Sequence, residues 1–147
     1  MSDKIKLTYA KVNDLVKKIV NEVNHIKFDY IVGVSRGGLV PAVIASHLLK
    51  LPLVPVTWST RDFAKQEHNY QILVDLVEGK NILLIDDIND TGKTFLDLIN
   101  DWEYTSDSKG KLVKASVLQR HTTTYPSDYY GEMILSDNWI LFPWERL

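Results

Sequence analysis

An apolar run that ends in adjacent acidic residues constrains the fold of this chain more than any other segment. Residues 82–85, Ile-Leu-Leu-Ile, have the apolar continuity of a buried parallel strand, and Asp86 and Asp87 follow directly. In open α/β sheets, ligands bind at the carboxyl ends of such strands. Two carboxylates about 6 Å apart at an effective dielectric of roughly 20 repel by about 3 kcal/mol, so the pair needs a cation or hydroxyl donors nearby. The segment therefore predicts a binding site at a strand end.

The turn that follows the acidic residues has the composition of a phosphate site. Thr91, Gly92 and Thr94 can bend the backbone into a nest of N–H groups at the start of a helix that we expect to begin near Lys93. Carboxylates followed within a few residues by such a nest suit a ligand with a sugar diol, or a metal ion, beside a phosphate. Ribose 5-phosphate fits that description.

Two familiar motifs compete for these residues. The Gly-Lys-Thr at 92–94 could end a P-loop, but that loop requires glycine at the position of Asp87, whose carboxylate would repel a nucleotide. Residues 33–37, Gly-Val-Ser-Arg-Gly, have the spacing of a hydrolase nucleophile elbow, and His121 could complete its catalytic order. However, the chain is short for that fold and has no His-Gly-Gly-Gly oxyanion segment, and an elbow leaves the aspartates at 86, 87 and 90 unexplained.

Three segments together resemble the type I phosphoribosyltransferase family. Residues 82–94 are similar to its phosphoribosyl pyrophosphate signature, in which a hydrophobic strand precedes two acids, three variable positions and Thr-Gly-x-Thr. Residues 32–41 resemble the pyrophosphate loop of the family, and residues 138–145 resemble the carboxyl-terminal segment of bacterial xanthine-guanine phosphoribosyltransferases. These matches follow the order found in the family and span most of the chain.

The resemblance assigns the sugar phosphate to the first two segments. Asp86 and Asp87 point to opposite sides of a strand and cannot do identical jobs, and Asp87 matches the acid more often associated with the Mg²⁺ that the family uses. In relatives the peptide joining Ser35 and Arg36 is often cis, and we predict the same here. The residues expected to bind phosphoribosyl pyrophosphate are Ser35, Arg36, Gly37, Gly38, Asp86, Asp87, Asp90, Thr91, Gly92, Lys93 and Thr94.

The resemblance also implies a purine site with departures from the family pattern. Asp90 would face the ring nitrogen N7 and manage its proton while N9 attacks, a position where orotate and uracil enzymes lack an acid. Arg120 stands where the family usually has a lysine that donates to the exocyclic oxygen of the purine. Trp139 would stack on the base, and carbonyls around Ile140 would accept from substituents at its two-position. Leu141 occupies a place where relatives often carry an acid, so the preferred purine stays open.

Each of these roles has a plainer alternative. Asp86 and Asp87 could be strand-end carboxylates in solvent, and Asp90 could be a turn residue. Arg36 and Arg120 could be solvated arginines in ordinary turns. Trp139 could simply close the core. Residues 59–69 stand where the family has a lid that excludes water, with Arg61 and Lys65 toward the leaving pyrophosphate, although a plain solvated loop would have the same composition.

Periodicity predicts an α/β fold, and the resemblance implies the single-domain fold of the type I phosphoribosyltransferases, in which helices flank a mostly parallel central sheet beside a small carboxyl-terminal hood. Thr8 is expected to cap an amphipathic helix that continues to Val23. Further helices are expected at 39–49 and 95–104. Strands are expected at 30–34, 53–58, 70–77, 81–85 and 112–118, with 70–77 and 81–85 antiparallel around the Glu-Gly turn at 78–79.

Composition agrees with one enzyme domain over residues 1–147. The chain has 45% hydrophobic residues, no cysteine and a net charge of -2, which gives no basic field for nucleic acid. With no apolar run near 18 residues and no signal-peptide core, a soluble cytoplasmic protein without a transmembrane segment is expected. Relatives form dimers or tetramers, so a homodimer or homotetramer is expected.

The function that these observations predict is transfer of the 5-phosphoribosyl group from phosphoribosyl pyrophosphate to N9 of a 6-oxopurine, which is guanine, xanthine or hypoxanthine, in purine salvage. Two alternatives stay open at this point. The chain could bind phosphoribosyl pyrophosphate as a regulatory signal without transferase activity, or it could transfer to a pyrimidine or another base.

Overall fold

The structure, a computed structural model, describes residues 4–58 and 66–146, and within them five parallel strands form the central sheet. Their order across the sheet is β3-β2-β4-β5-β6, with every neighbouring pair parallel. The strands are β2 (Tyr30–Ser35), β3 (Leu53–Thr57), β4 (Ile82–Asn89), β5 (Leu112–Arg120) and β6 (Tyr129–Ile134). Because β4 lies in the middle, its acidic end is flanked by strands on both sides.

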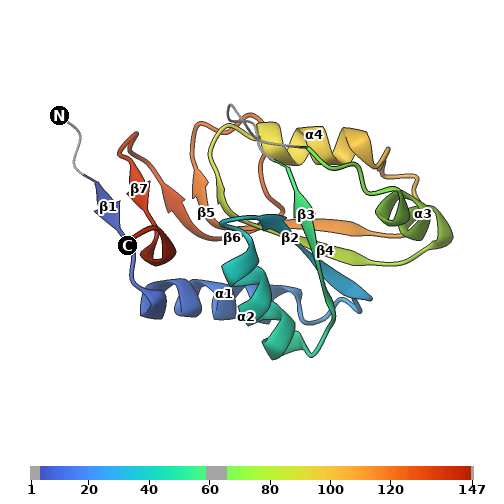
Figure 1. Cartoon of the computed structure of the whole chain (residues 1–147), viewed down its shortest axis with the longest axis horizontal. Coiled ribbons are helices and arrows are strands. Elements are labelled where there is room, and N and C mark those ends of the chain that lie inside the picture. Colours follow the sequence, from blue (N-terminus) through green and yellow to red (C-terminus); the bar gives the residue numbers. More distant parts are fainter. Residues whose placement is uncertain (1–3, 59–65, 147) are drawn as a thin grey trace.

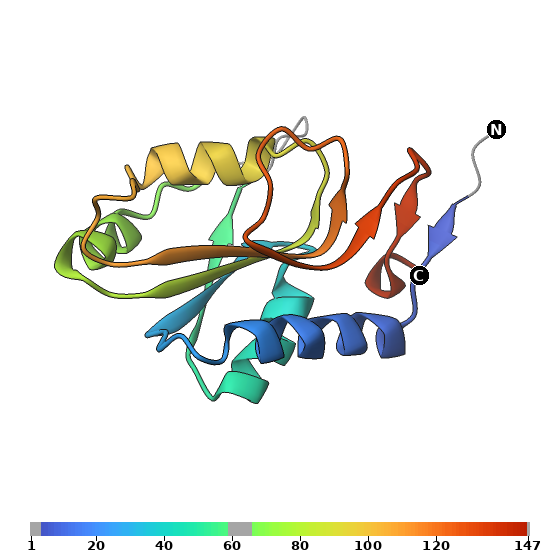
Figure 2. The same cartoon turned by 180° about the vertical axis from the view of Figure 1, so that it is seen from behind.

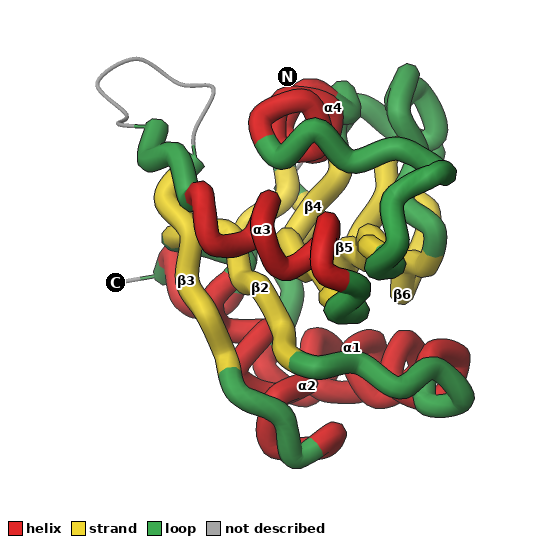
Figure 3. Tube along the Cα trace, turned by 90° about the vertical axis from the view of Figure 1, so that its right-hand side faces the viewer, coloured by secondary structure: helices red, strands yellow, loops and turns green. Residues whose placement is uncertain are grey.

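Helices cover both faces of this sheet, with α1 (Tyr9–Val23) and α2 (Leu39–Leu49) on one and α3 (Tyr70–Glu78) and α4 (Lys93–Asp101) on the other (Figures 1 and 3). Successive residues of β4 enter the two cores in turn. Leu83 and Ile85 pack with α1 and α2, whereas Ile82 and Leu84 pack on the side of α3 and α4. A nearly continuous apolar strand is therefore required, as expected for a parallel sheet buried on both faces.

A hood lies beside the main sheet, and both termini contribute to it (Figure 2). Strand β1 (Ile5–Lys6) pairs in parallel with β7 (Ile140–Leu141), and a short 3₁₀ helix (Pro143–Glu145) follows. The Phe142 and Trp144 rings stack with centroids 4.8 Å apart. The expected hood is thus present, but its amino-terminal strand was not predicted because two residues are too short to show a period.

Several predicted elements agree with the structure. Thr8 caps α1, since its Oγ1 accepts a hydrogen bond from the Lys11 amide at 3.0 Å. The helix at 39–49 has the predicted bounds. Strands β4 and β5 extend beyond their predicted ends, to Asn89 and Arg120, and β6 was not predicted. None of the helices in the described residues has the length and apolar content needed to cross a membrane.

The prediction of a strand at 70–77 was wrong, because this segment is helix α3. Asn69 caps its start by accepting from the amides of Gln71 and Ile72, and Gly79 ends it with a φ of 102°. Ile72 and Leu76, four residues apart, are the buried apolar positions, so the segment has a helical period. With a helix before it, β4 is parallel to β2 and not antiparallel to the preceding element.

A buried hydrogen bond ties α3 to β2 and yields a stability prediction. The Tyr30 hydroxyl donates to Asp75 Oδ2 at 2.6 Å, and Asp75 is 3% exposed. Burial alone would raise the pKa of Asp75, but hydrogen bonds from Tyr30 and Gln71 and the Lys80 ammonium outweigh burial and lower the pKa. The ionised carboxylate therefore stabilises the folded protein above the pKa of the unfolded chain, and this contribution is lost as the pH falls through the lower folded-state pKa.

We expect Tyr30→Phe to lower the free energy of unfolding by about 1.5 to 3 kcal/mol at neutral pH, because a buried charged acceptor loses a donor. Urea unfolding at neutral pH and again at acid pH checks this, and the difference from the unmodified protein should shrink in acid. Tyr70→Phe is the control, since Tyr70 is 76% exposed. Equal unfolding midpoints for the Tyr30 variant and the unmodified protein would contradict the prediction.

Candidate active site

The adjacent acids lie inside β4, before its last two residues, Ile88 and Asn89. The Asp87 amide donates to Asp86 Oδ1 at 2.8 Å, and the Ile88 amide donates to Asp87 Oδ1 at 2.7 Å. Leu83 and Ile85 pack with α1 and α2, but Ile88 packs against the same cluster, so strict alternation along β4 is interrupted at the acids. The two carboxyl groups lie close enough to shift each other's pKa values through a side-chain contact, so the division of the pair between two sides of the strand stays a prediction.

The loop between β2 and α2 closes directly over these acids. The peptide between Ser35 and Arg36 is cis, as predicted. A Cβ on Gly37 would overlap the Asp87 carboxylate, and a Cβ on Gly38 would lie 2.7 Å from the Val34 carbonyl oxygen and 2.9 Å from that of Ile85. Only glycines allow the loop to come this close to the acids.

Both carboxylates resist ionisation in this place. Burial, and then the charge of Asp87, raise the pKa of Asp86 well above its usual value. Burial also raises the pKa of Asp87, with a further contribution from Glu145 of the hood, although hydrogen bonds from its neighbours oppose the rise. A cation or hydroxyl donors bound here would recover the free energy that the two charges cost.

The turn after β4 forms the predicted helix start. Gly92 has a φ of 93° and is the cap of α4, whose first N–H groups have no acceptor inside the helix. A Cβ on Gly92 would lie 2.6 Å from the Tyr125 amide nitrogen. The Thr124 amide donates to the Thr91 carbonyl at 3.0 Å, so the loop that follows β5 supports this turn. An anion at the turn would meet aligned N–H groups and the positive end of the helix dipole.

Sequence reasoning missed the buried side chain that holds this turn in place. Asn89 is 4% exposed, and its Nδ2 donates to the Tyr125 carbonyl at 2.8 Å and to Ser127 Oγ at 3.1 Å. Its Oδ1 accepts from Thr123 Oγ1 at 2.8 Å. A polar residue at the end of an apolar strand was the available signal, since a buried amide must find partners.

The residues predicted to contact the base lie on the hood side of the same turn. Arg120 Nε donates to Asp90 Oδ1 at 2.8 Å, and its Nη1 and Nη2 donate to the carbonyls of Ser136 and Asn138 at 2.6 and 3.2 Å. Trp139 comes next in the chain and is 52% exposed, whereas Ile140 is buried in β7. The structure therefore brings Asp90, Arg120 and the hood loop together.

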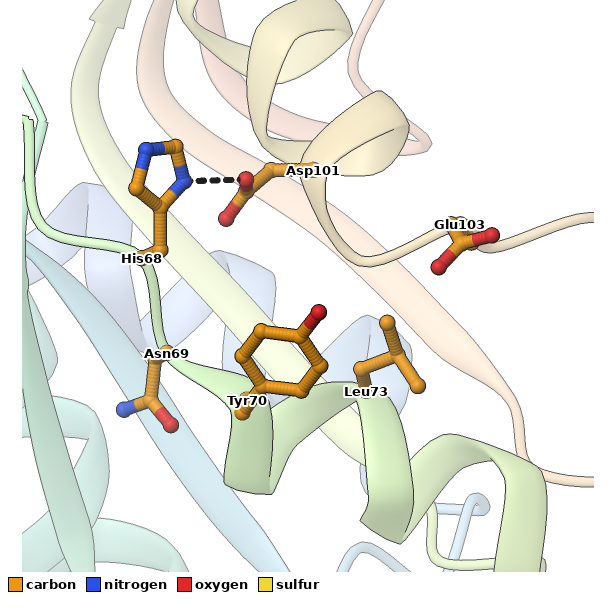
Figure 4. A pocket seen from close by; sticks show the side chains of 6 residues that line it. All are labelled: His68, Asn69, Tyr70, Leu73, Asp101 and Glu103. Atoms are coloured by element: carbon orange, nitrogen blue, oxygen red, sulfur yellow. Dashed lines mark hydrogen bonds and ion pairs between the residues drawn. The ribbon is translucent and has the colours of Figure 1, made fainter.

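The lid and the nucleophile elbow considered from the sequence receive no support from the described residues. Arg61 and Lys65 of the expected lid, and all of 59–65, are outside the described residues. His121 Nδ1 lies 3.3 Å from the Ile134 carbonyl oxygen, to which it can only donate, and this contact gives the nucleophile-elbow alternative no support. A cavity of about 230 Å³ lies between α3 and the end of α4, where His68 pairs with Asp101 at 2.5 Å (Figure 4), and none of the predicted site residues line it.

The described residues offer oxygen donors for a hard cation but no closed metal cage. No three His, Cys, Asp or Glu side chains gather around one point in the part of the chain that the structure describes. Asp86 and Asp87, with their raised pKa values, fit Mg²⁺, which is commonly held by one or two carboxylates together with substrate phosphates.

Comparisons with known proteins agree with this geometry. Residues 3–145 match the family model of the phosphoribosyl transferase domain. A xanthine-guanine phosphoribosyltransferase of Idiomarina loihiensis is 31% identical over 119 residues, which cover 78% of this chain and 70% of that protein. A crystal structure of a purine phosphoribosyltransferase from Pyrococcus horikoshii has a TM-score of 0.79 and 30% identity, and the match covers 99% of this chain and 95% of that one. A xanthine-guanine-hypoxanthine phosphoribosyltransferase of Helicobacter pylori, 19% identical with a TM-score of 0.73 over 99% of this chain and 95% of that one, has the same fold.

Proposed function

Because this chain belongs to the phosphoribosyl transferase family, we propose that it transfers the 5-phosphoribosyl group of phosphoribosyl pyrophosphate to N9 of a 6-oxopurine, in purine salvage. The observation that carries the proposal is the contact between Gly37 and the Asp87 carboxylate, beside the helix start at Gly92. Pyrophosphate, ribose and 5-phosphate need three neighbouring sites. We assign them to the loop at Gly37, the acids of β4 and the helix start at Gly92, in that order.

The sugar phosphate is bound by groups from three loops. Arg36 is exposed at the cis peptide and offers a charged fork to the pyrophosphate. Asp86 and Asp87 accept from the ribose hydroxyls, and the turn that begins at Thr91 and includes Lys93 and Thr94 surrounds the 5-phosphate. When bound, Mg²⁺ supplies charge neutralisation for the pyrophosphate, and Asp87 is the residue that we assign to it.

The base is held between the turn and the hood. Trp139 offers an exposed ring for stacking. The amides of Ile5 and Leu7 donate to the carbonyls of Trp139 and Leu141, so β1 occupies those two acceptors. Since carbonyls alternate along a strand, the Ile140 carbonyl points to the opposite edge of β7, where it can accept from a substituent at the two-position.

The chemistry requires a proton acceptor and a stabilised leaving group. Asp90 accepts the proton from N7 while N9 attacks the anomeric carbon. Pyrophosphate departs toward Arg36. Positioning and electrostatic stabilisation supply most of the rate acceleration, because the protein forms no covalent bond to the substrates.

Incubation with phosphoribosyl pyrophosphate, Mg²⁺ and each of hypoxanthine, guanine, xanthine, adenine, uracil and orotate tests the proposal. We expect pyrophosphate release with one or more of the first three bases. Turnover only with uracil or orotate would identify a pyrimidine enzyme. Uptake of phosphoribosyl pyrophosphate without turnover of any base would instead indicate a regulatory binding protein.

We also propose that residues 1–147 act as one phosphoribosyltransferase domain, as a cytoplasmic homodimer or homotetramer. The family match over residues 3–145 supports the single domain. Light scattering of the purified protein measures the oligomeric state directly.

A further inference from the structure

We propose that Arg120 is a positioning residue, which holds Asp90 and the hood loop at 136–138 in one fixed arrangement. This inference rests on the proposed function, because it assigns Asp90 its role in proton handling. It departs from the expectation that Arg120 replaces the family lysine as a donor to the purine oxygen.

Arg120 links the turn after β4 to the hood loop through hydrogen bonds from its guanidinium, and we call this set of contacts the Arg120 clamp. Its side chain is 11% exposed, and each of its three nitrogens donates to a different oxygen, on Asp90, Ser136 and Asn138. A guanidinium has five N–H donors, so two are left over. However, bonds from all three nitrogens fix the plane of the group, and it cannot turn toward a base without breaking one of them. A lysine ammonium is a single point charge and cannot span the same three acceptors.

The backbone of Arg120 provides a rigid base for this clamp. Arg120 is the last residue of β5, and in the sheet it is paired with Ile134, the last residue of β6. The amide of the next residue, His121, donates to the Ile134 carbonyl at 3.0 Å. The hood loop leaves β6 after Ile134. The Arg120 side chain therefore hydrogen-bonds to this loop close to where the loop departs from the sheet.

Asp90 depends on this clamp more than the other acids do. Its side chain is 56% exposed in a turn, whereas Asp86 and Asp87 are partly buried in β4. The 2.8 Å bond from Arg120 Nε restrains one carboxylate oxygen, Oδ1, and leaves Oδ2 for the substrate. The same guanidinium holds the Asn138 carbonyl, directly before Trp139, so the proton acceptor and the stacking ring are placed by one side chain.

Kinetics of Arg120→Gln and Arg120→Lys separate the clamp from a direct base contact. We expect Arg120→Gln to lower kcat by at least about tenfold with a smaller change in KM for the purine, and Arg120→Lys to recover part of kcat by restoring the charge beside Asp90. We also expect faster hydrogen exchange in peptides covering residues 135–139 of both variants, because the carbonyl contacts are lost. A rise in KM for the 6-oxopurine at unchanged kcat would overturn the clamp in favour of the base contact.

Arg146→Gln is the matched control, since Arg146 is another arginine of the hood whose side chain donates to a backbone carbonyl, that of Leu7. We expect its kcat to stay within about twofold of the unmodified protein. An equal loss of kcat in the Arg146 and Arg120 variants would overturn the proposal, because general loosening of the hood would explain both. Unchanged hydrogen exchange at 135–139 in Arg120→Gln would also overturn it.

An unmodified protein that turns over no base would overturn the proposed function itself, whereas an active unmodified protein with an equally active Arg120→Gln overturns only the role of Arg120.

Discussion

Asp90→Asn is expected to lower kcat by at least about 100-fold while the Kd for phosphoribosyl pyrophosphate changes by less than about threefold. The amide oxygen can still accept from Arg120 Nε, so the 2.8 Å contact is retained and the turn keeps its shape. What is lost is the negative charge and the ability to accept a proton from N7. Steady-state kinetics with guanine, xanthine and hypoxanthine, together with calorimetric titration of phosphoribosyl pyrophosphate, measure the two quantities separately.

Asp128→Asn is the control for this substitution. Asp128 pairs with Lys114 at 3.3 Å near the start of β5, at the opposite end of that strand from Arg120. We expect this variant to keep its turnover, because Asp128 contacts Lys114 at the far end of β5 and not the proposed site. An Asp90→Asn enzyme with normal kcat would remove Asp90 from the chemistry and leave it as a turn residue.

Gly37→Ala is expected to weaken binding of phosphoribosyl pyrophosphate by at least about tenfold, which corresponds to roughly 1.4 kcal/mol. The new methyl group would overlap the Asp87 carboxylate, which the Ile88 amide holds by a 2.7 Å hydrogen bond. Either the loop must move away from β4, or the carboxylate must leave its place. Both outcomes separate the pyrophosphate site from the ribose site, and calorimetry in saturating Mg²⁺ measures the loss.

Gly79→Ala provides the comparison, because Gly79 ends α3 with a φ of 102° and lies next to Lys109. Alanine is strained at that φ and costs about 1 kcal/mol of stability, but it leaves the loop over β4 unchanged. We expect lower stability with normal affinity in this variant. If Gly37→Ala binds phosphoribosyl pyrophosphate as tightly as the unmodified protein, the loop at 35–38 does not hold the pyrophosphate.

The elements with strong local signals were predictable from sequence. Three local signals agree with the tertiary structure: Thr8 at the start of α1, the apolar run of β4 and the glycines before α2. Helix α3 was mistaken for a strand because its β-branched and aromatic residues suit either state, and the caps at Asn69 and Gly79 were not weighed. Strand β1 was missed because its pairing partner, β7, lies at the far end of the chain.

Some residues of the candidate site were likewise predictable from sequence, whereas others were found only in the tertiary structure. Sequence placed Asp86, Asp87 and the helix start at Gly92 within one short segment, since strand, acids and turn are contiguous and their chemistry is set by residue type and spacing. Only the tertiary structure decided that Gly37 meets Asp87 and that Arg120 joins Asp90 to the hood. Those contacts join residues 30 to 50 positions apart, or link a strand end to carbonyls whose direction depends on the path of the backbone. A sequence carries the donors and acceptors, but the direction of each backbone carbonyl and the closeness of two loops exist only once the sheet has assembled.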